Sequence, residues 1–158
     1  MEKFGVVAAA AAVGGVVGAL VSYAILSKSK RKVILHPLNK ECGKGFVYNK
    51  AYIHGEVVYV SGQVAVPLLG PGKPVPAIKD EIRFVLQTLK EVLEEAGSGI
   101  DKVMKTGCLL TSIEDYGAFN EVYSEFFSDN ASKPTRVCYA TKELPLGARV
   151  EVECTAYL

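Results

Sequence analysis

The segment PTRVCYATKELPLGARVEVE, residues 134–153, contains the side chains of this 158-residue chain that are best suited to chemistry. Arg136 and Cys138 stand between apolar strand formers, and Glu151 and Glu153 alternate with valines in the next apolar run. Alternate residues of a strand share a face, so the two carboxylates are expected side by side. An arginine in such a place needs an anionic partner, because burying an unpaired cation is costly. The pattern indicates a binding site, since a domain with nothing to bind usually keeps such positions apolar.

The cysteines do not suggest a metal site. Cys42, Cys108, Cys138 and Cys154 show no CxxC or Cys/His spacing of the zinc-binding kind. Three of them lie in apolar, strand-like surroundings, which is typical of buried reduced thiols rather than of a disulfide framework. We therefore expect neither a metal nor a disulfide.

The first residues form a separate apolar segment. Phe4–Leu26 has no charged residue and as a helix could cross a hydrocarbon core of about 30 Å. A basic cluster follows at 28–32, and basic residues tend to stay on the cytoplasmic side. The interpretation is an uncleaved transmembrane anchor over 1–27 and a basic linker over 28–40. The domain over 41–158 would face the cytosol, with the anchor in an organelle membrane. A secretory signal or a transit peptide remains an alternative, which would place the protein in the secretory pathway or the mitochondrion.

The charge balance disfavours a nucleic-acid partner. Four of the 18 basic residues belong to the cluster at 28–32, which leaves 14 against 17 acidic residues. The globular part is thus slightly acidic and lacks the basic footprint of a nucleic-acid binder.

Hydrophobic periodicity predicts two helices among several strands. Apolar residues over 78–93 follow helical spacing, and Gly97 is a natural C-cap. Ser112 can cap a second helix that ends near 127, and the aromatic stripe of this helix is expected to pack in the core. The result is an α+β fold, a mixed sheet with both helices on one face, whose other face further subunits could cover. Strands are expected over 33–38, in a hairpin over 45–66 that turns at Gly55, and over 103–110, 136–141 and 149–158.

Three blocks of the sequence resemble the Rid proteins (the YjgF/YER057c/UK114 superfamily), and specifically their RidA branch of imine deaminases. The blocks are YVSGQVAV, LKEVLEEAGSGIDKVMKTGCLLTSIEDYGAFNEVYSEFF and KPTRVCYATKELPLGARVEVECTAY. The resemblance runs from about Phe46 to Tyr157. It implies a chorismate-mutase-like fold, a homotrimer with a central barrel, and clefts between neighbouring subunits.

The resemblance also implies roles for individual residues. Arg136 would grip the carboxylate of the substrate, and Cys138 and Glu151 match the cysteine and glutamate of the same pocket. One departure is Phe46-Val47, where the family often has Gly-Pro before the matching tyrosine. The other residues that match substrate-binding positions are Tyr48, Ser61, Gly62 and Asn120.

The activity implied is hydrolysis of 2-imino or 2-enamino acids, such as 2-iminopropanoate and 2-iminobutanoate, to 2-keto acids and ammonia without a cofactor. Glu151 would move protons, or would instead hold Arg136 across the subunit boundary. Cys138 is expected to line the pocket, because no histidine is near it in sequence to activate it. Two alternatives are a non-enzymatic ligand-binding or chaperone-like protein and, less favoured, an RNA-cleaving inhibitor of translation.

Overall fold

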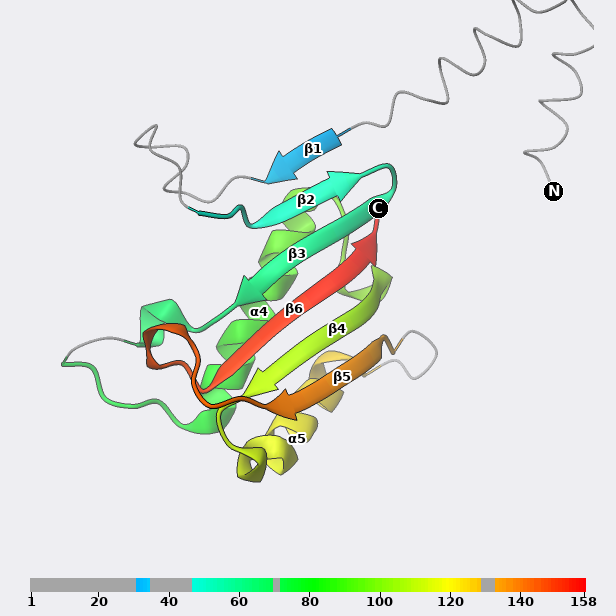
Figure 1. Ribbon diagram of the computed structural model, residues 1–158. Coiled ribbons are helices and arrows are strands. Elements are labelled where there is room, and N and C mark those ends of the chain that lie inside the picture. Colours follow the sequence, from blue (N-terminus) through cyan, green and yellow to red (C-terminus); the bar gives the residue numbers. More distant parts are fainter. Residues whose placement is uncertain (1–30, 35–46, 70–71, 129–132) are drawn as a thin grey trace, which may run out of the picture. The chain divides into compact units, whose positions relative to one another are not determined.

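The computed structural model describes residues 31–34, 47–69, 72–128 and 133–158 (Figure 1). The predicted anchor over 4–26, most of the basic linker, and Phe46 lie outside these ranges. Within the described ranges no helix is both long and apolar enough to span a membrane. The strands and α-helices are β1 (Arg31–Ile34), β2 (Ala51–His54), β3 (Val57–Gln63), α4 (Ile78–Ala96), β4 (Val103–Leu110), α5 (Tyr116–Phe126), β5 (Thr135–Ala140) and β6 (Val150–Tyr157).

The six strands form one mixed sheet in the order β1-β2-β3-β6-β4-β5. Strands β2 and β3 form the predicted hairpin, whose turn contains Gly55 at a φ of 62°. The C-terminal strand β6 lies between β3 and β4 and is antiparallel to both, whereas β4 and β5 are parallel. This arrangement makes β5 an edge strand of the sheet (Figure 1).

Both helices cover the same face of the sheet, as the sequence predicted (Figure 1). The chain passes from β3 through α4 to β4, then through α5 to β5, and both steps run in the same direction across the sheet. Crossovers between parallel strands are right-handed, so two steps in one direction place their helices on one side. The α+β class with two helices is therefore confirmed.

The two helices begin and end close to their predicted positions. Helix α4 ends at Gly97, which adopts the left-handed conformation at a φ of 89°. The second helix starts differently: residues Ile113–Asp115 form a 3-10 turn before α5 begins at Tyr116. The hydroxyl of Ser112 accepts a hydrogen bond from the backbone N–H of Glu114, which holds this tighter turn in place.

The apolar face of α4 packs on the inner residues of β3 and β6. Val58 and Val152 are fully buried between the sheet and this helix. The described elements leave the opposite face of the sheet open, where Tyr59, Tyr139 and Tyr157 are about half exposed. One side of the sheet is therefore a core and the other is a surface that a further subunit could cover.

A buried ion pair ties α4 to the start of β6. The Glu81 carboxylate is fully buried, and it accepts hydrogen bonds from the backbone N–H of Arg149 at 2.7 Å and from its Nε at 2.8 Å. The Nη2 atom of Arg149 donates to the carbonyl oxygen of Pro76 at 2.7 Å. These bonds fix the strand two residues before Glu151.

We expect Glu81→Ala to lower the free energy of unfolding by about 3 kcal/mol, because it leaves Arg149 and a backbone N–H without their buried partner. The matched control is Glu121→Ala, since Glu121 pairs with Lys79 on the exposed surface. That change should alter stability by less than about 1 kcal/mol. Urea denaturation of the three proteins at one protein concentration measures the difference, and equal midpoints would contradict the structural role of Glu81.

Candidate active site

Arg136 lies on β5 and its side chain rests on three aromatic rings of α5. Its Cζ atom is 4.8 Å from the ring centroid of Tyr123, 5.6 Å from that of Tyr116 and 5.9 Å from that of Phe119. At these distances the ring faces attract the cation. The Nη2 atom also donates a hydrogen bond to the Tyr116 hydroxyl at 3.0 Å. The guanidinium therefore has a defined place although it is only half buried.

The ring nearest the guanidinium is itself held in position. The hydroxyl of Tyr123 shares a hydrogen bond of 2.8 Å with the hydroxyl of Thr106, and both side chains are buried. Thr106 lies directly opposite Arg136 in the register of β4 and β5. The aromatic stripe, assigned from sequence to the core alone, thus also supports the arginine. The signal that could have revealed this is the pair of hydroxyl groups on the stripe, because buried tyrosine hydroxyls need polar partners.

No acidic group neutralises Arg136 within the part of the chain that the structure describes. The ion pairs there join other cations to carboxylates, and none includes this guanidinium. A guanidinium carries five N–H donors, and the Tyr116 hydroxyl accepts from one of its nitrogens. The remaining N–H groups can donate hydrogen bonds to an anion from outside the chain.

Cys138 lies two residues after Arg136 on the same strand face and is half buried. Burial raises the pKa of its thiol, and the nearby Arg136 lowers it by a smaller amount. The thiol therefore stays protonated near neutral pH, which suits a residue that lines a pocket better than a nucleophile. Cys108 and Cys154 are buried free cysteines, as the sequence predicted, while Cys42 lies outside the described residues.

Glu151 and Glu153 lie on the open face of the sheet, each above a glycine of a neighbouring strand. A Cβ atom placed on Gly62 of β3 would lie 1.8 Å from Oε1 of Glu151, and one on Gly107 of β4 would lie 2.8 Å from Oε1 of Glu153. The glycines thus provide the space that the two carboxylates occupy. The predicted neighbours Glu151 and Gly62 do come together.

The pKa of Glu151 is raised above its ordinary value. Burial is the larger cause, and the negative charge of Glu153 on the same face is the second. A carboxyl group with a raised pKa keeps its proton to higher pH than ordinary glutamate does. This direction of the pKa shift favours a role in proton transfer over that of a permanently ionised glutamate.

Arg136 and Glu151 lie on opposite faces of the sheet of one chain. Arg136 and Cys138 are in register with the buried residues Thr106 and Cys108, so their side chains point toward α5. Glu151 belongs to the alternate positions of β6 that face away from the helices. Strand β4 lies between β5 and β6, so the two backbones are about 10 Å apart. One copy cannot present both side chains to one small molecule.

Of the other predicted residues, one lies near Arg136 on the helix side of the sheet, and the others lie near Glu151 and Gly62. Asn120 follows Tyr116 by one turn of α5 and so shares its side of the helix. Ser61 precedes Gly62 in an irregularity of β3, and its hydroxyl donates to the carbonyl oxygen of Asn49 at 2.7 Å. Tyr48 is about half exposed and lines a pocket of about 350 Å³ together with Gly62.

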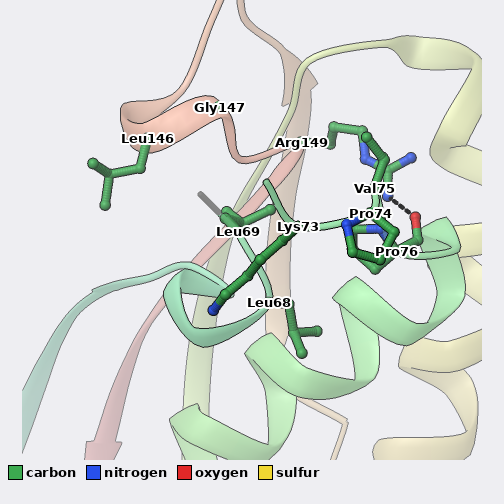
Figure 2. Close-up of a pocket in the computed structure, with 9 residues that line it drawn as sticks. All are labelled: Leu68, Leu69, Lys73, Pro74, Val75, Pro76, Leu146, Gly147 and Arg149. Carbon is green, nitrogen blue, oxygen red and sulfur yellow. Dashed lines mark hydrogen bonds between the residues drawn. The ribbon is translucent and has the colours of Figure 1, made fainter. Parts of the chain in front are cut away.

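Another pocket, of about 460 Å³, lies beside the loop before α4 (Figure 2). Its lining residues include Leu68, Val75, Leu146 and Arg149 but none of the seven residues predicted for the site. Arg149 lies at one side of it and donates a hydrogen bond to the carbonyl oxygen of Pro76 (Figure 2). The buried Glu81 holds Arg149 from the core side. This pocket is largely apolar and offers no acid–base group comparable to Glu151. Across the described ranges the structure contains no cluster of three or more metal-binding side chains.

Glu153→Gln should lower the pKa of Glu151, because the substitution removes the neighbouring charge that helps to raise it. The pKa should remain above the ordinary value, since burial is the larger cause. The measurement is a titration of the glutamate carboxyl carbons by NMR. Glu143→Gln, on an exposed loop, is the matched control and should leave Glu151 unchanged. An identical Glu151 titration in the Glu153 variant and the parent would show that the two carboxylates do not interact.

Proteins of similar sequence and structure identify the family of the chain. Residues 44–158 match the family described as Endoribonuclease L-PSP. The chain is 40% identical over 113 residues to the mitochondrial protein mmf1 of Schizosaccharomyces pombe, covering 69% of this chain and 67% of that protein. It is 36% identical over 110 residues to the 2-iminobutanoate/2-iminopropanoate deaminase of Rattus norvegicus, covering 69% and 78%. The crystal structure of an L-PSP-type protein from Entamoeba histolytica superposes with a TM-score of 0.66 at 43% identity, covering 82% of this chain and all of that one. The chain belongs to the Rid (YjgF/YER057c/UK114, L-PSP) family.

Proposed function

We propose that this protein hydrolyses reactive 2-imino and 2-enamino acids, such as 2-iminopropanoate and 2-iminobutanoate, to 2-keto acids and ammonia. The observation that carries the proposal is the positioned Arg136 guanidinium, which has no carboxylate partner within the described residues. A planar carboxylate can accept two parallel hydrogen bonds from such a fork. The rat relative named as a 2-iminobutanoate/2-iminopropanoate deaminase supports the same substrate class.

Hydrolysis of an imine needs little beyond a substrate held in position and the transfer of protons. Water adds to the imine carbon, so that a C–O bond forms while the C=N electron pair moves to nitrogen, which takes a proton. The C–N bond of the resulting carbinolamine then breaks, ammonia leaves, and the hydroxyl loses its proton as the ketone forms. In this proposal Glu151 passes these protons directly or through water, and Arg136 holds the acid group still. Cys138 lines the pocket beside Arg136.

We further propose that the site is formed between two copies of the chain. Arg136 and Cys138 of one copy would face Glu151 and Gly62 of the next, because these two groups lie on opposite faces of one sheet. The open face with its half-exposed tyrosines supports such packing. A ring of three copies would enclose these faces as a central barrel, the chorismate-mutase-like trimer that the sequence resemblance implies.

The two alternative functions, ligand binding without activity and RNA cleavage, have less support. A ligand-binding protein without activity would need Arg136 but would have no use for a proton-carrying Glu151 on a neighbouring copy. RNA cleavage is suggested by the description of the matched family. The globular part is slightly acidic, and the chain has two histidines, His54 at the exposed end of β2 and His36 outside the described residues. These features disfavour an RNA-cleaving site.

Arg136→Ala should reduce the kcat/KM of imine hydrolysis on the order of 100-fold, because the substrate loses a bidentate charged contact. Arg136→Lys should retain more activity, since lysine keeps the charge but not the planar fork. The assay generates 2-aminoacrylate with a serine dehydratase and follows the release of pyruvate. Arg83→Ala, which removes a surface arginine of α4, is the matched control and should behave as the parent.

Three results would decide against the proposal. An Arg136→Ala protein as active as the parent would exclude the carboxylate grip. A parent protein that binds 2-keto acids but does not accelerate pyruvate release would instead be the non-enzymatic relative. RNA cleavage that copurifies with the parent and is absent from the Arg136 variant would favour the nuclease.

Mixed assemblies test the shared site. Arg136→Ala and Glu151→Gln should each be inactive alone, yet a trimer containing both chains should have roughly one intact site out of three. Co-expression with two different affinity tags isolates these hybrids for the pyruvate assay. The control pairs Arg136→Ala with the Arg136→Ala/Glu151→Gln double variant, which offers no intact pair. Hybrids as inactive as this control would contradict a site shared between neighbouring copies.

A further inference from the structure

The guanidinium of Arg136 is oriented by neutral groups, and Tyr116 provides its one directional contact among the described side chains. The geometry points to Tyr116 as a positioning residue that sets the plane of the Arg136 fork, and to a site that selects a ligand carboxylate over the corresponding neutral amide. This inference rests on the proposed function for the identity of the ligand. It adds a residue and a selectivity that the proposed reaction does not require by itself.

Tyr116 is placed by the turn that precedes it. It is the first residue of α5 and follows the 3-10 turn that Ser112 caps. Its side chain is 37% exposed, so that one edge of the ring contacts solvent while the hydroxyl accepts from Nη2 of Arg136 at 3.0 Å. The hydroxyl thus lies at the boundary between the buried rings and the outside, where an incoming carboxylate would meet the guanidinium.

The other two rings cannot fix the orientation of the fork. Phe119 is fully buried and has no polar atom, and the hydroxyl of Tyr123 is engaged by Thr106. Their ring faces attract a cation but allow it to rotate about the axis perpendicular to the ring, because the attraction has no donor–acceptor direction. A hydrogen bond does have a direction. Tyr116 therefore supplies the directional contact that the other two rings lack.

A neutral acceptor also preserves the charge that the ligand needs. A carboxylate in the place of the Tyr116 hydroxyl would form an ion pair with Arg136 and would compete with the carboxylate of the ligand. The phenol hydroxyl orients the fork without cancelling its charge. A neutral amide would gain little from this charge, which is why the site should discriminate between an acid and its amide.

The test measures binding of 2-oxobutanoate and of its neutral amide to the full chain by calorimetry, together with imine hydrolysis. Tyr116→Phe should weaken binding of the acid by about three- to tenfold, because it removes one hydrogen bond to a charged group. The KM should rise by the same factor with kcat nearly unchanged, and the weak binding of the amide should not change. Tyr116→Asp should weaken binding of the acid further than Tyr116→Phe does.

Arg83→Ala on the exposed surface of α4 is the control, expected to bind the acid as the parent does. Binding of the acid by Tyr116→Phe at the parental affinity would overturn the inference, as would equal affinity of the parent for the acid and the amide. Failure of the proposed function is a different result. A protein whose acid binding depends on Tyr116 but which does not hydrolyse imines retains this site and loses only the reaction.

Discussion

The Arg136 guanidinium lies against the ring of Tyr123 with no carboxylate partner among the described residues. Proteins rarely leave a half-buried cation in that state, since desolvation without a partner is unfavourable. Here the ring faces and a phenol hydroxyl offset part of that penalty while leaving the positive charge intact. The structure on this side of the sheet, from the Thr106–Tyr123 hydrogen bond to the tight turn before α5, fixes the rings that contact this one charge.

The second constraint is the alternation of side chains along strands. It places the arginine of β5 on the helix side and the glutamates of β6 on the open face, so the cation and the carboxylates are separated by the thickness of the sheet. A single copy therefore presents the cation on one face of the sheet and the carboxylates on the other. The proposed packing of copies would cover the exposed tyrosines of the open face and bring the two groups together.

Local patterns in the sequence were sufficient to predict most of the fold. The apolar spacing of α4, its glycine cap at Gly97 and the alternation around Glu151 depend on neighbours in the chain, which a sequence displays directly. The separation of Arg136 from Glu151 could not be predicted in this way. It follows from the insertion of β6 between β3 and β4 and from the parallel register of β4 and β5, and such pairings between distant segments leave no local pattern. The contact between the Tyr116 hydroxyl and Arg136 was missed for the same reason.

The close approach of Glu151 to Gly62 links two positions that are 89 residues apart in the sequence. A methyl group at Gly62 would occupy the space of the Glu151 carboxylate. The carboxylate can therefore keep its present position only while residue 62 has no side chain. Substitutions at Gly62 and Glu151 are therefore coupled. A descendant that acquires alanine at Gly62 would have to turn the carboxylate of Glu151 to another position or shorten the side chain, and in either case the carboxylate would leave the place that it now occupies above β3.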